Sequence, residues 1–325
     1  MLMNSTVRIP ELKGRGLFVF SDPGGAKPML AIAERHLEPI VLSDRLHTFY
    51  DNFNVDVEIC YKNIDGIISK HNPDFIVTGT SYRSTIEKEI HRLAARESIP
   101  CFAFVDHWTS FRERFEQADG SLLVPDQVWV LDERAKTLAI KAGIPEQQVV
   151  ITGNPYYDWL GNWKPNINKE TFLDHAGLSS SKERLLLFAP DPLSNIDGKH
   201  IYGFDEIEVT DQIDKLFSSN QIQNWIVLFK AHPNQNAKVL KNILRSCNSI
   251  YLLPDSIDTN TALFYSDAVM GFFSNILIEA SLLGKSVLRY LPSELENDPF
   301  VALQIGTKTN QVQLPEHLQS LSIFA

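Results

Sequence analysis

Short apolar segments that alternate with helical patterns are the feature of this chain that most limits its fold. Continuous apolar runs predict strands at 16–20, 39–42, 57–60, 74–79, 100–106, 126–131 and 148–152, and again at 182–190, 225–230, 250–253, 267–270 and 286–290. Helical spacing fills the intervals, for example at 64–71, 84–97 and 205–218. Strands that are apolar throughout must be covered on both faces, as they are in a parallel sheet flanked by helices. The sequence therefore predicts an α/β protein built on parallel sheets.

This alternation occurs twice, which predicts two domains. A chain of 325 residues is also longer than one typical domain. A polar stretch at 160–181, broken by Asn, Gly, Pro and Trp, separates the two series and is typical of a linker. We expect a doubly wound, Rossmann-like domain at 1–160 and a second at 161–325, with the carboxyl ends of both sets of strands facing a cleft.

Charge and composition exclude several functional classes. The net charge is −10 and acidic and basic residues are interspersed, which argues against a nucleic-acid-binding face. The three cysteines are far apart and predict neither disulfides nor a zinc site. The N-terminus lacks the apolar core of a signal peptide, and no apolar run approaches the roughly 18 residues that span a bilayer. We expect a cytoplasmic protein, and we leave peripheral membrane contact and homodimer formation open.

The segment 270–288 predicts an anion site. An apolar strand ends at Met270, and Ser274 and Asn275 are good N-cap residues for the apolar helix that follows. A helix N-terminus above a strand end attracts phosphate through its N–H groups and its dipole. Glu279, about one turn further on, could accept hydrogen bonds from two ribose hydroxyls. The alternative is an ordinary strand–helix unit with a solvated Glu279.

Two turns in the first half are further candidates. The turn at 21–26 contains Gly24 and Gly25, which let the backbone approach a ligand closely, and Asp22, which could face the cleft or only cap a helix. The turn at 78–83 contains Thr80, which could line a pocket or act as an N-cap. Neither turn matches a known phosphate-loop pattern.

Functional side chains gather just past the predicted strand at 100–106. Asp106 and His107 are followed at once by Trp108, and Arg112 is close in sequence. A histidine beside a carboxylate is a common way to build a general base. We favour a catalytic site here over a purely structural cluster, with Asp106 and His107, or else Asp22, as the general base.

A histidine also follows a strand in the second half. Pro233 forces the chain out of the strand at 225–230, so His232 should lie at the carboxyl edge of the sheet. Its ring could donate to a phosphate, and Lys230 could add positive charge. No group of residues has metal-ligand spacing, and we expect neither a metal nor another cofactor.

Together these segments resemble the GT-B superfamily of nucleotide-sugar enzymes over nearly the whole chain. The order of 73–80, 99–107, 143–155, His232-Pro233-Asn234 and 274–287 is most similar to that of the non-hydrolysing UDP-N-acetylglucosamine 2-epimerases. The resemblance implies a nucleotide bound in the C-terminal half, with Ser274 and Asn275 on the phosphates and Glu279 on the ribose. An acceptor would lie against the N-terminal half.

The chain also departs from the epimerase pattern. That family has an acidic residue where this chain has Thr80, a His-Arg pair where it has Pro190-Asp191-Pro192, and two glycines followed by two acids where it has Ser274-Asn275 and Glu279. Asp106 alone matches the family's second acid. The Lys-x-His-Pro segment and the serine-plus-glutamate segment are more similar to capsule and teichoic-acid transferases and bacterial sialyltransferases, which use cytidine-linked donors.

We therefore expect a metal-independent glycosyltransferase that moves a sugar from a UDP-, CMP- or CDP-linked donor to a hydroxyl of a surface glycan or small-molecule acceptor. One alternative is an enzyme like the UDP-N-acetylglucosamine 2-epimerases. The other is a non-catalytic partner subunit that binds nucleotide sugars.

Overall fold

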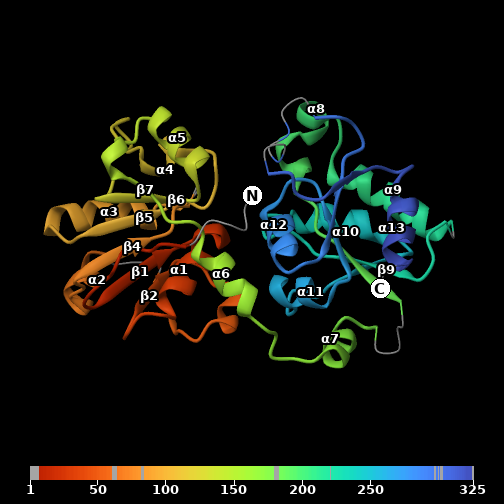
Figure 1. The fold of residues 1–325 in the computed structure, drawn as a ribbon, viewed down its shortest axis with the longest axis horizontal. Helices are drawn as coiled ribbons and strands as arrows, with labels where there is room; N and C mark the ends of the chain where they lie inside the picture. Colours follow the sequence, from red (N-terminus) through yellow and green to blue (C-terminus); the bar gives the residue numbers. More distant parts are fainter. Residues whose placement is uncertain are drawn as a thin grey trace. The chain divides into compact units, whose positions relative to one another are not determined.

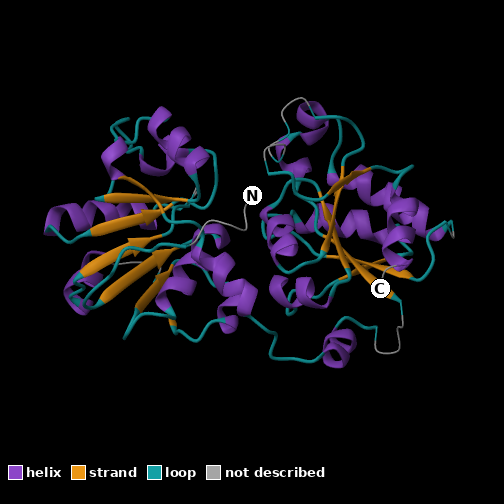
Figure 2. Cartoon of the chain, in the orientation of Figure 1, coloured by secondary structure: helices purple, strands orange, loops and turns teal. Residues whose placement is uncertain are grey.

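The computed structural model describes residues 7–60, 64–81, 84–178, 183–219, 221–295, 298, 300 and 303–323. The chain divides into two compact units, Leu2–Asn162 and Trp163–Ala325. This division falls close to the predicted domain boundary between residues 160 and 161. Each unit is a parallel sheet flanked by helices (Figure 2). The predicted α/β class, with two doubly wound sheets, is confirmed.

In the described residues, the sheet of the N-terminal unit has seven strands in the order β3-β2-β1-β4-β5-β6-β7 (Figure 1). The strands are β1 (Gly16–Phe20), β2 (Ile40–Ser43), β3 (Val57–Ile59), β4 (Phe75–Thr78), β5 (Cys101–Phe104), β6 (Gln127–Val130) and β7 (Val149–Ile151). The helices are α1 (Pro23–Ala33), α2 (Ile64–His71), α3 (Ile86–Glu97), α4 (Phe111–Phe115), α5 (Glu133–Lys141) and α6 (Pro155–Asn162), with 3₁₀ turns η2 (Thr48–Asn52) and η3 (Glu146–Gln148).

Alternate residues of β1 pack on opposite faces of this sheet. Leu17 and Val19 belong to a buried cluster that includes Ile67 of α2 and residues of α3. Phe18 points the other way and meets the ring of His36, just past α1, edge to face with centroids 5.8 Å apart. Helix α1 covers β1 on that side, and α6 packs against α1 (Figure 1). Burial on both faces explains why β1 is apolar throughout.

In the described residues, the sheet of the C-terminal unit has six strands in the order β10-β9-β8-β11-β12-β13. The strands are β8 (Arg184–Phe188), β9 (Trp225–Phe229), β10 (Ile250–Leu252), β11 (Ala268–Gly271), β12 (Ser286–Tyr290) and β13 (Thr307–Thr309). The helices are α7 (Lys169–His175), α8 (Gly198–Tyr202), α9 (Glu206–Ser218), α10 (Ala237–Arg245), α11 (Thr259–Tyr265), α12 (Asn275–Leu282) and α13 (Leu314–Ile323), with the 3₁₀ turn η4 (Leu193–Ile196).

Aromatic rings fill the core of this unit at the carboxyl ends of its strands. Phe188 ends β8 and Phe229 ends β9, and the two rings meet edge to face at 5.6 Å. Phe272, just after β11, contacts Phe188 in the same way at 6.2 Å. Ile213 of α9 and Leu318 of α13 complete the same buried cluster. The loops that leave this edge of the sheet therefore start from fixed positions.

The structure differs from the sequence expectations in three places. Helix α1 begins at Pro23 rather than near residue 27, since the first helical position needs no N–H donor. Gly24 and Gly25 therefore lie in the first turn of a helix, not in a turn before it. Strand β13 and helix α13 were not predicted, because β13 (Thr307–Thr309) is a polar edge strand with no apolar run. Tyr82 and Arg83 of the predicted 78–83 turn lie outside the described residues.

Across the described part of the chain, no helix is both long enough and apolar enough to cross a bilayer.

Candidate functional site

The C-terminal sheet reverses its strand order between β8 and β11. From β8 the chain moves outward to β9 and β10, and then returns to β11 and continues to β12 on the other side. In open α/β sheets, ligands bind beyond the carboxyl ends of the strands at such a switch point. The loops that begin there carry Asp191 after β8 and Ser274 after β11. Both residues therefore border the expected binding position.

Helix α12 starts at this switch point. Ser274 holds the N-cap position in an extended conformation, but its side chain makes no capping hydrogen bond. In five other helices of the described residues the N-cap side chain does accept such a bond: Asp132, Asn168, Asp205, Asn236 and Asp258. A helix N-terminus without a side-chain cap can offer its N–H groups and dipole to an anion. Ser274 and Asn275 are the first two residues of this terminus.

Glu279 lies one turn further along α12 and is only 6% exposed. Its neighbours Ile276, Ile278 and Ala280 are buried as well. A buried carboxylate needs a partner inside the fold, and Glu279 does interact there. The predicted contact with a ribose requires ligand hydroxyls to reach a side chain with little exposed surface, so it stays a prediction.

His232 follows β9, as predicted, and its tautomer can be assigned from its contacts. The main-chain N–H of Asn234 donates to His232 Nδ1 at 3.1 Å. Burial lowers the pKa of His232, which favours the neutral ring. Because Nδ1 accepts, Nε2 carries the ring proton. His232 can therefore donate one hydrogen bond from Nε2 to a ligand oxygen.

The side chain of Lys230 binds within the fold, a contact that its sequence context did not predict. Its Nζ donates to the main-chain oxygen of Ile257 at 2.8 Å. Burial lowers the pKa of Lys230, while Asp255 and Asp258 act in the opposite direction. The ammonium thus holds the loop between β10 and α11, and its role toward a phosphate stays a prediction.

Asp191 brings a carboxylate to the start of the α12 loop. Its Oδ2 accepts a hydrogen bond from the main-chain N–H of Phe273 at 3.1 Å, one residue before Ser274. Burial raises the pKa of Asp191 to about 6, although the Phe273 N–H and Arg289 favour the charged form. This carboxyl group therefore changes charge near neutral pH, next to the candidate anion site.

The N-terminal sheet has its own switch point, between β1 and β4. Asp22 follows β1 as the N-cap residue of α1, but its side chain does not cap the helix. Asp22 Oδ1 instead accepts from Arg45 Nη1 at 2.9 Å, and the pair is partly exposed. The N–H of Asp22 donates to Ser81 Oγ at 2.9 Å, which ties the loops after β1 and β4 together.

The glycines of α1 allow this helix to approach its neighbours closely. A β-carbon on Gly25 would lie 3.1 Å from the Cα of Gly79. A β-carbon on Gly24 would lie 1.9 Å from Asp106 Oδ2. Gly24 therefore makes room for the Asp106 carboxylate against the first turn of α1, where the helix dipole favours a negative charge.

Arg114 connects two of the predicted residues. Its Nη1 donates to Asp106 Oδ1 at 3.1 Å, to Thr80 Oγ1 at 2.8 Å and to the main-chain oxygen of Thr80. The Thr80 hydroxyl in turn donates to the carbonyl of Phe104 at 2.9 Å. Thr80 is 3% exposed, so it positions Arg114 and Asp106 inside the fold, and its contact with a substrate stays a prediction.

Sequence reasoning missed Arg114 and noted Arg112 instead. Arg112 is exposed and pairs with Glu116 one turn along the chain. Arg114 is only 9% exposed although it lies two residues away on the same short helix, α4. A buried arginine needs a carboxylate partner, and the nearest predicted one was Asp106. Asp106 and Arg114 are eight positions apart, and nothing in that spacing indicates that Arg114 is buried, so the sequence carried no signal for this pairing.

The side chains of His107 and Trp108 are held by different partners. His107 Nδ1 lies 2.8 Å from Thr109 Oγ1. Burial lowers the pKa of His107, Asp106 raises it, and Arg114 and Arg134 lower it. Trp108 is 6% exposed and donates to Asp132, so it does not offer an open face to a sugar.

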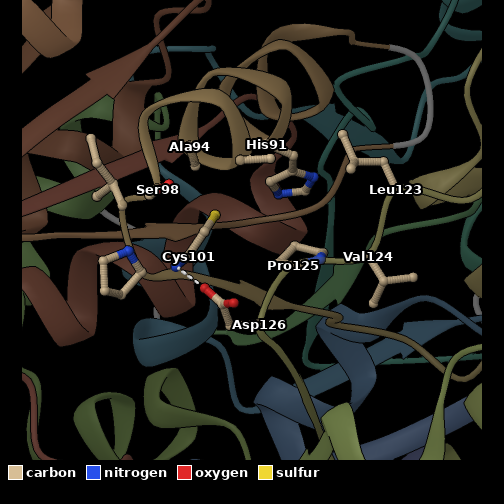
Figure 3. A pocket seen from close by; sticks show the side chains of 11 residues that line it. His91, Ala94, Ser98, Cys101, Leu123, Val124, Pro125 and Asp126 are labelled. Carbon is tan, nitrogen blue, oxygen red and sulfur yellow. Dashed lines mark hydrogen bonds between the residues drawn. The ribbon is translucent and has the colours of Figure 1, made fainter.

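A cavity of about 480 Å³ opens at the opposite, amino edge of the N-terminal sheet. Figure 3 shows it between His91 and Ala94 of α3, Cys101 at the start of β5, and Asp126 before β6. None of the predicted site residues lines it, and neither does any lysine or arginine. It therefore lacks the groups that a phosphate needs.

Within the described residues, no group of three or more His, Cys, Asp or Glu side chains could hold a metal ion.

Comparisons with solved structures show which known proteins share this fold. No protein-family model and no curated protein matches the chain in sequence. The UDP-GlcNAc 2-epimerase of Neisseria meningitidis, bound to UDP-GlcNAc, superposes with a TM-score of 0.66 at 15% identity, over 96% of this chain and 92% of that one. Staphylococcus aureus MnaA with UDP gives 0.64 at 17% identity, over 95% and 88%. Anabaena HepE with UDP-glucose gives 0.62 at 14% identity, over 94% and 89%. The predicted resemblance is confirmed as a likeness of fold.

Proposed function

We propose that this protein is an enzyme that binds a UDP-linked sugar and inverts a centre of that sugar, as a 2-epimerase does. The C-terminal unit binds the nucleotide. The phosphates of the nucleotide contact Ser274 and Asn275 at the N-terminus of α12, and they also accept a hydrogen bond from the Nε2–H of His232. The ribose hydroxyls contact Glu279. The observation that carries the proposal is the switch point between β8 and β11, where α12 begins without a side-chain cap.

The likeness to the three solved structures supports the choice of nucleotide. All three hold UDP or a UDP-sugar, and each matches at least 94% of this chain. The sequence left uridine and cytidine open, and this likeness favours uridine. It also favours the epimerase alternative. Sugar transfer was the main expectation from the sequence.

By acid–base chemistry, inversion of a carbon bearing hydrogen needs one group to remove a proton and another to return it on the opposite face. The electron pair left behind forms a double bond as UDP leaves the neighbouring carbon, and UDP rejoins that carbon when the proton returns, so the product is again a UDP-sugar. In the N-terminal unit we assign removal to Asp106, held by Arg114. His107 lies beside it, and burial lowers its pKa, so the neutral ring can share the proton that Asp106 takes up. Asp22, whose carboxylate is paired with Arg45, is the alternative base.

Transfer of the sugar to a hydroxyl acceptor is the second candidate, and Thr80 favours it. The epimerases carry an acid at this position, whereas the Thr80 hydroxyl is engaged with Phe104 and Arg114. A transferase needs only one base, which would remove the proton of the acceptor hydroxyl. Asp106 could serve in that role without a second acid.

Incubation with UDP-GlcNAc alone separates the two candidates. An epimerase converts the sugar without any acceptor, and ¹H NMR should show a new anomeric signal from a product that is again a UDP-sugar. A transferase should leave UDP-GlcNAc unchanged until an acceptor hydroxyl is added, and should then release UDP. Calorimetric binding of UDP-GlcNAc with no reaction under either condition would contradict both and leave the non-catalytic subunit.

Glu279→Gln is expected to weaken UDP binding by about tenfold. The substitution removes the charge but keeps the shape, and hydrogen bonds to a charged group contribute about 1.5–3 kcal/mol. Calorimetry with UDP measures the change. Glu316→Gln on the exposed side of α13 is the matched control and should bind as the parent does. Equal affinity of both variants, with an intact fold, would remove Glu279 from the site.

UDP-GlcNAc affinity is expected to rise as the pH falls from 8 to 5.5, through the titration of Asp191. Above its pKa of about 6 the carboxylate repels the phosphates, and below it the neutral acid does not. The expected gain is about 1 kcal/mol, roughly fivefold. Asp191→Asn keeps an acceptor for the Phe273 N–H. This variant should bind at pH 8 as tightly as the parent does at pH 5.5. Parallel pH curves for the two proteins would contradict the assignment.

A further inference from the structure

Glu87 is a buried carboxyl group that no sequence expectation covered. It lies in the first turn of α3 and is 2% exposed. Its Oε1 accepts a hydrogen bond from Ser81 Oγ at 2.5 Å. Its Oε2 is buried and has no hydrogen-bond partner among the described residues. A carboxylate in such a position is costly, so a role beyond packing is the simplest reason for keeping it.

Ser81 links Glu87 to the carboxyl edge of the N-terminal sheet. Ser81 follows β4, one of the two strands at the switch point. Its Oγ accepts from the N–H of Asp22 at 2.9 Å and gives its own proton to Glu87. While Glu87 is charged, the hydroxyl proton of Ser81 therefore points at the carboxyl group.

Among the described residues, two acids, Asp22 and Asp44, act on the charge of Glu87. Asp22 lies in the loop after β1, and Asp44, which follows β2, accepts from Ser84 Oγ at 2.7 Å. Arg45 is close by but is paired with Asp22. Burial raises the pKa of Glu87 to about 7, the Ser81 hydroxyl opposes this, and Asp22 and Asp44 add to the rise. The group therefore changes charge near neutral pH.

We propose that Glu87 and Ser81 form the proton relay of the N-terminal unit, with Glu87 acting on the substrate through the Ser81 hydroxyl. In the step that returns a proton, neutral Glu87 gives the proton on Oε1 to Ser81 Oγ while the Ser81 proton moves to the substrate carbon, on the face opposite Asp106. The electron pair of the substrate double bond forms the new C–H bond as UDP rejoins the neighbouring carbon. The reverse step returns both protons. Glu87 is thus a positioning residue, and it supplies the exchangeable proton that Thr80 lacks at the epimerase acid position. This inference rests on the proposed function.

Titration of Glu87 tests the relay without any reaction. The ¹³C signal of the Glu87 carboxyl group, assigned by its absence in Glu87→Gln, should move with a midpoint near pH 7. In Ser81→Ala the midpoint should rise, because the hydroxyl that favours the charged form is gone. A midpoint near 4.5 in the parent protein would overturn the proposal, even if the protein turns over no UDP-sugar and the proposed function fails.

The pH dependence of kcat tests the role in the reaction. The parent rate should fall as the pH passes 7, because the relay needs the proton of neutral Glu87. Glu87→Gln and Ser81→Ala should lower kcat by roughly 10²-fold and lose this limb, while UDP affinity stays unchanged. Ser81→Thr keeps the hydroxyl and should restore most of the rate. Glu97→Gln, at the exposed end of the same helix, is the control. Parent-like rates in Glu87→Gln and Ser81→Ala would overturn the relay.

Discussion

Asp106→Asn is expected to lower kcat by about 10²–10⁴-fold while leaving UDP affinity within about twofold, since this is the usual effect of removing a general base. The carboxylate lies against Gly24 in the first turn of α1 and accepts from Arg114. The amide has the same shape and still offers an oxygen to Arg114, so the fold should be kept. The base is lost under either chemistry, because both an epimerase and a transferase must remove a proton.

The control for this experiment is Glu113→Gln. Glu113 is exposed on α4, one residue from Arg114, and should not affect the rate. Turnover of Asp106→Asn should be measured with UDP-GlcNAc alone and with an added acceptor. UDP affinity is measured by calorimetry on the same preparation. If Asp106→Asn keeps more than half of the parent rate, the base lies elsewhere and Asp22 becomes the next candidate.

The central strands and their parallel pairing could be predicted because these strands are buried on both faces, as in β1, β4, β8 and β11. The segment at 270–288 could also be predicted, since a strand, a polar pair, an apolar helix and Gly284 follow one another within a short stretch. The polar edge strand β13 could not, because its residues carry no apolar pattern and only its pairing with β12 makes it a strand.

Contacts distant in sequence account for what the sequence did not predict at the site. Arg114 reaches Thr80 across 34 positions, and Lys230 reaches Ile257 across 27. No local pattern contains either contact. Glu87 is different, because Ile86, Ile90 and Ala94 form the buried stripe of α3 and Glu87 lies within it. A charged residue on the apolar stripe of a helix is a signal that sequence reasoning can use.

Arg289→Met is expected to destabilise the C-terminal unit by about 3–5 kcal/mol, because it leaves a buried carboxylate without its main partner. The Arg289 guanidinium donates to both oxygens of Asp298, at 2.9 and 2.6 Å, and the two side chains are 3% and 4% exposed. Its Nε also donates to the carbonyl of Phe272 at 3.0 Å, two residues before Ser274. The substitution should therefore also weaken UDP binding, since it releases the loop that leads into α12.

Urea unfolding of Arg289→Met, Asp298→Asn and the double variant measures this pairing. The double variant should be more stable than the sum of the single effects predicts, because neither charge is then left alone. Lys215→Met breaks the exposed pair with Asp211 and should cost less than about 0.5 kcal/mol. Additive effects in the double variant would show that Arg289 and Asp298 do not act as a pair.

The same pair should give the unit an acid-sensitive component of stability. Burial by itself would raise the pKa of Asp298, but the hydrogen bonds from Arg289 and the Phe300 N–H outweigh it and hold the pKa at about 2. A carboxyl group with a lowered pKa stabilises the folded state above its unfolded value of 3.8, and this contribution is lost as the pH falls toward 2. Arg289→Met should remove most of this dependence, because the group that lowers the pKa is gone. A parent-like loss of stability between pH 4 and 2 in this variant would mean that other carboxylates cause it.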